Sequence, residues 1–129
     1  MKKTNIFTDG STTKIAYVIE GFRPKVIPLK VKATVNEGEY WALIYALLEA
    51  IGLGITRVSV WSDSQLMVRQ INGQYRCKNK RLLELLTEVW RLAGILQEFE
   101  IDWIHREEND AGILLESKEH IKFIQGGSA

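Results

Sequence analysis

Three acidic residues occupy positions where their carboxylates could act together. Asp9 and Asp63 each end a run of strand-forming residues, and a small residue follows each acid and lets the chain turn. If the two runs are neighbouring parallel strands, about 4.8 Å apart, both carboxylates emerge at the same edge of a sheet. Glu39 lies in the first turn of a helical segment and could lean over that edge. An edge where the chain connections diverge is where α/β proteins place ligands.

Converging carboxylates would favour a bound cation. Anions at short range repel one another, so they protonate or separate unless a positive charge compensates them. Oxygen ligands with open positions favour Mg²⁺ or Mn²⁺ over zinc. Two such ions, roughly 4 Å apart, can activate water and stabilise the leaving oxygen during attack on a phosphodiester. The joint spacing predicts phosphoryl hydrolysis, whereas each acid taken singly is better explained as a strand-end or helix-capping residue.

The segments that must position these acids alternate between strand and helix patterns. Short runs rich in β-branched and aromatic residues predict five strands, at about Lys3–Asp9, Lys14–Glu20, Lys25–Lys32, Arg57–Ser62 and Phe99–Ile104. Helical spacing predicts a helix from Asn36, a short one that breaks at Asn72, a long one over Leu82–Leu96 and a terminal one after Asn109. This order predicts an α/β fold, a mixed five-stranded sheet with helices on both faces.

Length and composition limit the domain organisation. With 129 residues, 46% of them hydrophobic, the chain predicts a single domain over residues 1–125 and a flexible tail at 126–129. Seventeen basic against 16 acidic residues give a net charge of +1, so charge alone favours neither a nucleic-acid nor a membrane partner. A single cysteine, Cys77, excludes an internal disulfide. The sequence shows no signal peptide or membrane span, which predicts a cytoplasmic protein with no membrane partner.

Several motifs, in order and spacing, resemble those of type 1 ribonucleases H. They cover nearly the whole chain, as Phe7–Ser11, Thr34–Leu43, Trp61–Leu66, Gln70–Asn79 and Trp103–Asn109. The resemblance implies a ribonuclease H-like fold and a metal-dependent endoribonuclease that hydrolyses the RNA strand of RNA–DNA hybrids. We further expect a monomer without an organic cofactor.

The resemblance also implies roles for the three acids. Asp9 would bridge two Mg²⁺ or Mn²⁺ ions, and Asp63 would share one of them. Glu39 would in addition position the attacked strand near its 2′-hydroxyl, the group by which a protein can tell RNA from DNA.

The last motif departs from the family. Its fourth acid follows an alanine about four residues after the motif asparagine, a position that here holds Gly112 or Ile113. We predict that Asp110, at the start of the terminal helix, partly replaces this acid as a catalytic metal ligand. The alternative is a catalytically weak module that binds nucleic acid or a protein partner.

A basic run follows the third acid and precedes the long helix. It places four cations within six residues, which could neutralise phosphates or form a solvated helix-entry loop. Family context favours binding. The predicted nucleic-acid contacts are Gly10, Ser11, Asn36, Ser64, Arg76, Lys78, Asn79, Lys80 and Arg81.

We interpret the four tryptophans and His105 mainly as structural residues. The four tryptophans, Trp41, Trp61, Trp90 and Trp103, are predicted to pack in the core, because base stacking needs an exposed ring. His105 follows the last predicted strand and could shuttle protons, but we expect it to be structural.

Overall fold

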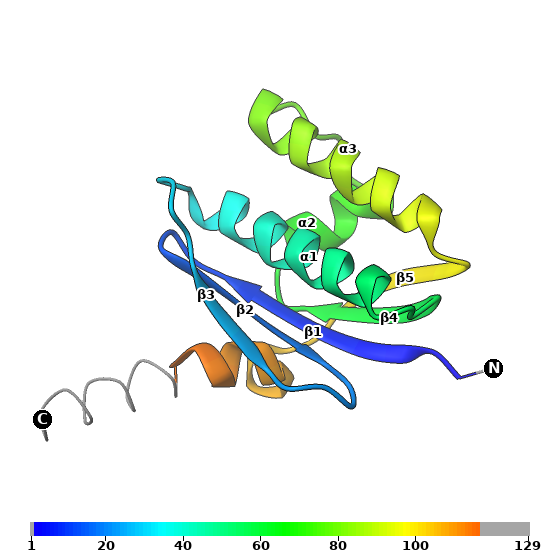
Figure 1. The fold of residues 1–129 in the computed structure, drawn as a ribbon. Helices are drawn as coiled ribbons and strands as arrows, with labels where there is room; N and C mark the ends of the chain where they lie inside the picture. Colours follow the sequence, from blue (N-terminus) through cyan, green and yellow to red (C-terminus); the bar gives the residue numbers. More distant parts are fainter. Residues whose placement is uncertain (1, 117–129) are drawn as a thin grey trace, which may run out of the picture.

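A computed structural model describes residues 2–116, which form one mixed sheet with helices on both faces (Figure 1). The strands stand in the order β3-β2-β1-β4-β5. Strands β1, β2 and β3 are antiparallel neighbours, while β4 and β5 run parallel to β1. Their bounds are β1 Thr4–Gly10, β2 Lys14–Ile19, β3 Lys25–Pro28, β4 Arg57–Ser62 and β5 Glu98–Trp103. The predicted mixed five-stranded sheet is confirmed.

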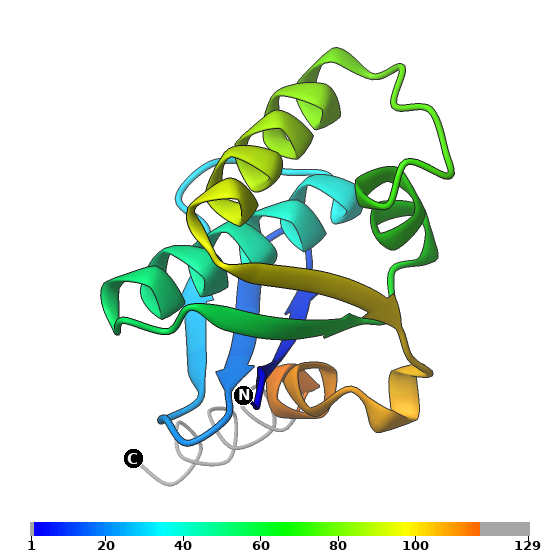
Figure 2. The same cartoon turned by 90° about the vertical axis from the view of Figure 1, so that its right-hand side faces the viewer.

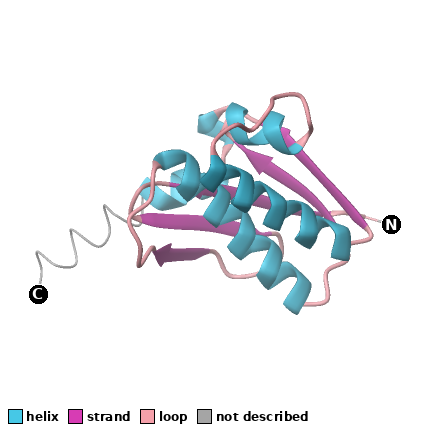
Figure 3. Ribbon diagram, turned by 90° about the horizontal axis from the view of Figure 1, so that it is seen from above, coloured by secondary structure: helices cyan, strands magenta, loops and turns pink. Residues whose placement is uncertain are grey.

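Three helices share one face of the sheet. They are α1 (Val35–Gly52), α2 (Gln65–Ile71) and α3 (Lys80–Ile95), and Figure 3 shows them lying over the strands. Each begins at a side-chain cap, since Thr34, Ser64 and Asn79 accept hydrogen bonds from backbone N–H groups in the first turn. The 3₁₀ turn η1 (Arg106–Glu108) and the helical residues 110–116 lie on the opposite face (Figures 1 and 2).

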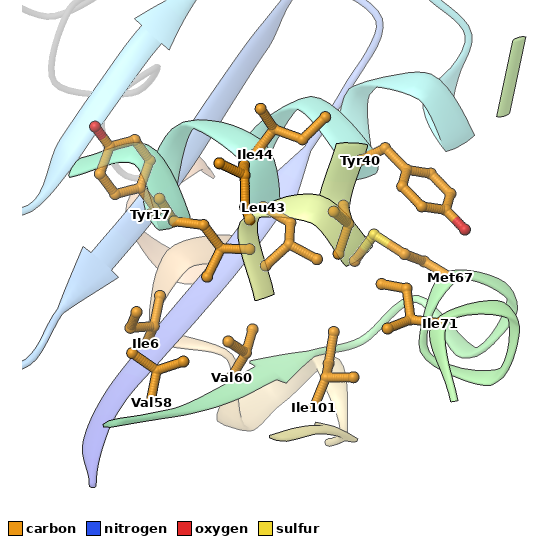
Figure 4. Close-up of a cluster of buried hydrophobic side chains, with 14 of the residues drawn as sticks. Ile6, Tyr17, Tyr40, Leu43, Ile44, Val58, Val60, Met67, Ile71 and Ile101 are labelled. Atoms are coloured by element: carbon orange, nitrogen blue, oxygen red, sulfur yellow. The ribbon is translucent and has the colours of Figure 1, made fainter. Parts of the chain in front are cut away.

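The main core fills the space between the sheet and α1 and continues between α1 and α3. Fully buried alanines on α1 let this helix pack closely against its neighbours on both sides. The largest buried side chains come from every layer (Figure 4), among them Ile6, Tyr40, Leu43, Val58, Val60, Met67 and Ile101. A smaller cluster, Ala16 with Ala111 and Leu115, attaches residues 110–116 to the other face. Both faces of the central strands are therefore anchored, which holds the strand ends in place.

Strand boundaries differ from the prediction at every strand except β4, by one residue at each differing end apart from the end of β3. Strand β3 ends at Pro28 instead of Lys32, because proline has no N–H to continue the ladder, and the Leu29 N–H instead bonds the Thr13 carbonyl at 2.8 Å. Strand β5 starts and ends one residue earlier than predicted.

The prediction that all four tryptophans are core residues is wrong for two of them. Trp90 is 48% exposed and Trp103 is 38% exposed. Each indole N–H donates to a backbone carbonyl, of Ile71 and Asp63 respectively, so the hydrogen bond holds the ring at the surface.

Among the described helices, none is long and apolar enough to cross a membrane. The predicted domain end at residue 125 and the predicted tail at 126–129 lie outside the described residues.

Candidate active site

Strand register places Asp9 beside Asp63. Strands β1 and β4 are parallel, and their last paired residues are Phe7 and Trp61. Asp9 lies two residues after Phe7, and Asp63 lies two residues after Trp61. Both carboxylates therefore leave the sheet at the same edge. This edge is where the chain of β1 turns back into a hairpin while β4 leads into a helix, which is the switch point expected from the sequence.

Two glycines, Gly10 and Gly38, allow the start of α1 to contact the end of β1. A Cβ on Gly10 would collide with the carbonyl of Gly38, and a Cβ on Gly38 would collide with the carbonyl of Ser11. The backbones therefore touch directly, as glycine alone permits. Glu39 follows at once, and its Oε1 accepts the N–H of Gly10 at 2.8 Å.

Three carboxylates meet at this edge. One oxygen from each of Asp9, Glu39 and Asp63 lies within 4.8 Å of the others. Asp9 and Glu39 are buried, and Asp63 is half-buried. The structure thus brings together the three acids that the sequence singled out as metal ligands.

Burial and mutual repulsion act on the acids. Burial first, and then the carboxylate of Asp63, raise the pKa of Asp9 to about 6. Burial, followed by Asp9 and Asp63, raises the pKa of Glu39 further, to about 9. The cluster is therefore costly to charge unless a cation compensates it.

Arg106 is a site residue that sequence reasoning missed. Its positive charge lowers the pKa of Asp9, opposing the larger effect of burial. Glu116, which bonds the guanidinium at 3.1 Å, and then Asp9 and Asp63 raise the pKa of Arg106. Arg106 falls inside the last motif, but no spacing rule brings the turn η1 to the acids across the sheet.

The segment that should carry a fourth acid reaches the cluster with glycine. A Cβ on Gly112 would lie 3.4 Å from Oδ2 of Asp9. Asn109 fixes the segment, because its buried Nδ2 donates to the Thr8 carbonyl at 2.9 Å. Asp110 is exposed and is not one of the converging acids, so its role as a ligand stays a prediction.

Comparison with known proteins decides the family. A family model described as reverse transcriptase-like matches residues 23–116, well over half of the chain. The chain belongs to this family. Its fold is that of type 1 ribonucleases H, as the sequence motifs predicted.

Three proteins illustrate the similarity. The bifunctional protein Rv2228c of Mycobacterium tuberculosis is 36% identical over 78 residues, 60% of this chain and 21% of that protein. RNase H1 of the halophilic archaeon Halobacterium salinarum NRC-1 has a TM-score of 0.79 at 22% identity, covering 85% of this chain and 91% of its own. LC11-RNase H1, isolated from compost and solved in complex with an RNA/DNA hybrid, has a TM-score of 0.76 at 28% identity, covering 84% and 89%. The chain spans about a fifth of the length of the curated relatives that it matches.

Three of the predicted nucleic-acid contacts of this ribonuclease H fold line one hollow between the starts of α1 and α3. Asn36, Asn79 and Arg81 surround a cavity of about 250 Å³. Nε of Arg81 also lies 2.8 Å from Oε2 of the buried Glu37, which neutralises part of its charge. Glu37 in turn accepts the Thr34 N–H at 2.7 Å, completing the capping box of α1.

The remaining predicted contacts lie at chain turns. Gly10 donates to Glu39, the Ser11 hydroxyl accepts from the Thr13 and Lys14 N–H groups, and Ser64 caps α2. The three other cations, Arg76, Lys78 and Lys80, are exposed. His105 is exposed too, and its ring meets that of Trp103 edge-on, with centroids 4.6 Å apart.

Proposed function

We propose that this domain is a metal-dependent endoribonuclease that hydrolyses the RNA strand of RNA–DNA hybrids. The observation that carries the proposal is the convergence of Asp9, Glu39 and Asp63 at one sheet edge. The similarity to LC11-RNase H1, which was solved with an RNA/DNA hybrid, supports the choice of substrate. Because the chain spans only part of its curated relatives, the proposal concerns this domain alone.

The donor set fits hard divalent cations. Carboxylate oxygens are the ligands that Mg²⁺ and Mn²⁺ prefer, and a bound cation would reverse the raised pKa values of Asp9 and Glu39. Asp9, Glu39 and Asp63 would hold two ions, with Asp110 as a partial fourth ligand. When bound, the ions supply an activated water and stabilisation of the leaving oxygen.

The residues of the chain orient the site independently of the ions. The Gly10 N–H holds one oxygen of Glu39, which fixes the carboxylate beside Asp9. From there Glu39 would approach the 2′-hydroxyl of the attacked strand and favour RNA over DNA. Arg106 offsets part of the repulsion between the acids.

Two groups of residues would contact the hybrid. Asn36, Asn79 and Arg81, which line one cavity, would hold a phosphate, with Arg76, Lys78 and Lys80 adding charge outside it. Gly10, Ser11 and Ser64 would contact the strand next to the acids. Polar and basic groups of this kind position a duplex without reading its sequence.

A second candidate function rests on Gly112. Because this residue faces Asp9 without a side chain, the site has fewer anionic ligands than the family pattern implies. A catalytically weak module that binds nucleic acid or a protein partner is therefore the alternative.

Cleavage of a labelled RNA–DNA hybrid in Mg²⁺ or Mn²⁺ tests both candidates. We expect cleavage of the RNA strand only, and loss of that cleavage in Asp9→Asn without a change in circular dichroism. Glu84→Gln, a change at an exposed acid on α3, serves as the control and should cleave at the parent rate. Equal rates for Asp9→Asn and the parent would contradict the metal-site proposal, and binding without cleavage in the parent would favour the module.

Oligomeric state and location are further parts of the proposal. We infer a cytoplasmic monomer without an organic cofactor. Sedimentation of the purified chain should give a single species of monomer mass, and a dimer would contradict that part of the proposal.

A further inference from the structure

A second polar hollow opens between α2 and β5, and one of its lining residues, Trp103, bonds the backbone of Asp63. It has a volume of about 220 Å³ and is lined by Gln65, Val68, Arg69, Asn72, Gln74, Asp102 and Trp103. This volume is below the roughly 300–1,000 Å³ typical of sites for drug-sized ligands, so the hollow suits one small group. None of the functions assigned above uses it.

The walls of this hollow are held by contacts of their own. The Trp103 indole N–H donates to the Asp63 carbonyl at 3.1 Å, and the Asn72 amide donates to the Ile101 carbonyl at 3.1 Å. Arg69 lies over the ring of Tyr75, with its guanidinium carbon 5.1 Å from the centroid, and donates to the Tyr75 hydroxyl at 2.6 Å. Three of the lining side chains are thus held in place by contacts within the protein.

Several polar side chains that line the hollow have hydrogen-bonding groups without a partner in the protein. Within residues 2–116, no hydrogen bond or ion pair engages the side chains of Asp102, Gln65 or Gln74. Asn72 keeps its amide oxygen as an acceptor, and Arg69 has further N–H donors after the bond to Tyr75. Donors and acceptors therefore face the same space, beside a half-exposed indole ring.

The charge pattern selects among small ligands. The Asp102 carboxylate disfavours a phosphate, and the Arg69 guanidinium disfavours a lone cation. A purely apolar group would leave the polar lining without partners. A neutral, flat ring with donors and acceptors on its edge satisfies all of these groups, and nucleobases that are not paired are recognised by such edge bonds and by aromatic neighbours.

We propose that this hollow binds one unpaired nucleobase next to the cut site. The location supports this, because Gln65 is two residues beyond Asp63 and Trp103 bonds the Asp63 backbone. The choice of a substrate nucleotide rests on the proposed function. A hybrid that carries a single-stranded extension beside the cleaved stretch would place its unpaired base here.

Nucleoside titration tests the site directly. The probe is the Nε1–H signal of Trp103 in the ¹⁵N-labelled protein, identified by its disappearance in Trp103→Phe. Adenosine, cytidine, guanosine or uridine should shift this signal saturably, whereas inorganic phosphate should not. Asp102→Ala should weaken nucleoside binding about tenfold, as expected for loss of a hydrogen bond to a charged group. Glu84→Ala, an exposed acid removed elsewhere, should leave binding unchanged.

Cleavage supplies the second measurement and separates the two proposals. A single-stranded extension should lower KM for the hybrid in the parent, and this advantage should be lost in Asp102→Ala but not in Glu84→Ala. A signal that does not respond to nucleosides, or responds to phosphate instead, would overturn the nucleobase site. Absence of cleavage with the nucleoside shift intact would overturn the proposed function and leave the nucleobase site standing.

Discussion

At the scale of single residues, the site depends on side chains and on one missing side chain. Glu39 is held by a backbone N–H, and Asp9 lies close both to the two other acids and to Gly112. If an acidic residue replaced Gly112, its Cβ would lie in van der Waals contact with Oδ2 of Asp9. The same residue that leaves the site short of ligands therefore offers a place to add one.

We expect Gly112→Asp to lower the metal concentration needed for half-maximal cleavage, because it adds an anionic oxygen ligand to the cluster. In metal-free protein the same change should reduce stability through added repulsion. Gly94→Asp, at a helix position with no atom within 4 Å of the added Cβ, is the matched control and should change neither property much. Cleavage measured against metal concentration checks this, and an unchanged requirement in Gly112→Asp would show that position 112 does not reach the ions.

The proposed role of Asp110 needs a separate measurement. If its carboxylate serves as a partial ligand through water, Asp110→Asn should raise the metal concentration required for cleavage, with Ile113→Asp as a variant at the other candidate position. Activity of Asp110→Asn equal to that of the parent, at every metal concentration, would rule out the substitute role.

At the scale of secondary-structure elements, the critical contact joins β1 to α1. Gly10 and Gly38 let two backbones touch, and this contact determines where Glu39 stands relative to Asp9. Because the neighbouring atoms are backbone atoms, a larger residue at either position can be accommodated only by moving the strand or the helix.

We expect Gly38→Ala to lose most hybrid cleavage and to destabilise the domain by about 1–3 kcal/mol, because its Cβ would displace α1 from β1. Gly52→Ala, in the last turn of the same helix and with no atom within 4 Å of the added Cβ, is the control. It should be neutral or stabilising by about 0.5–1 kcal/mol. Urea denaturation together with the cleavage assay checks both variants, and parent-like cleavage by Gly38→Ala would show that the contact does not position Glu39.

Much of the element order could be predicted because it depends on local patterns. Strand-forming runs, helical spacing and the break at Asn72 are visible in neighbouring residues, so the sheet and its helices were predictable. The contacts between distant segments could not be predicted. The glycine contact, the approach of Arg106 and the surface position of Trp103 depend on how distant segments meet, which no spacing rule contains.

At the scale of the whole molecule, charge is distributed unevenly although the net charge is only +1. Acids gather at one sheet edge, while the cations of residues 76–81 flank the start of α3. One of these cations, Arg81, is paired with Glu37, so the basic run carries less free charge than its composition indicates.

We expect alanine at Lys78 and Lys80 to weaken hybrid binding and to reduce the salt slope by about two units, one for each phosphate contact. Adding Arg81→Ala should reduce the slope by less than a further unit, because its charge is already partly neutralised by Glu37. Lys2→Ala with Lys25→Ala removes two cations outside residues 76–81, each paired with an acid of the chain, and should leave the slope unchanged. Fluorescence anisotropy at increasing salt checks this, and a parent slope in the Lys78 and Lys80 variant would mean that the run is only solvated surface.

Stability should depend on pH through the acid cluster. In the unfolded chain Asp and Glu titrate near about 4, whereas folding raises the pKa of Asp9 to about 6 and that of Glu39 to about 9. Between these values the folded protein holds more protons than the unfolded chain, so the contribution of the cluster to stability is present below about pH 4 and is lost as the pH rises toward 9.

Metal-free protein should therefore unfold at a lower temperature at pH 8 than at pH 5.5, and Mg²⁺ or Mn²⁺ should restore more stability at the higher pH, where the carboxylates are freer to bind it. Asp63→Asn removes one charge from the cluster, so without metal it should raise Tm at pH 8, by roughly 3–6 °C for each 1 kcal/mol of repulsion relieved. Asp102→Asn, an acid outside the cluster, is the control. Thermal unfolding followed by circular dichroism, with and without metal, gives the comparison. A Tm for Asp63→Asn that falls without metal, or a metal effect equal at both pH values, would show that repulsion among these three acids does not govern the stability of the site.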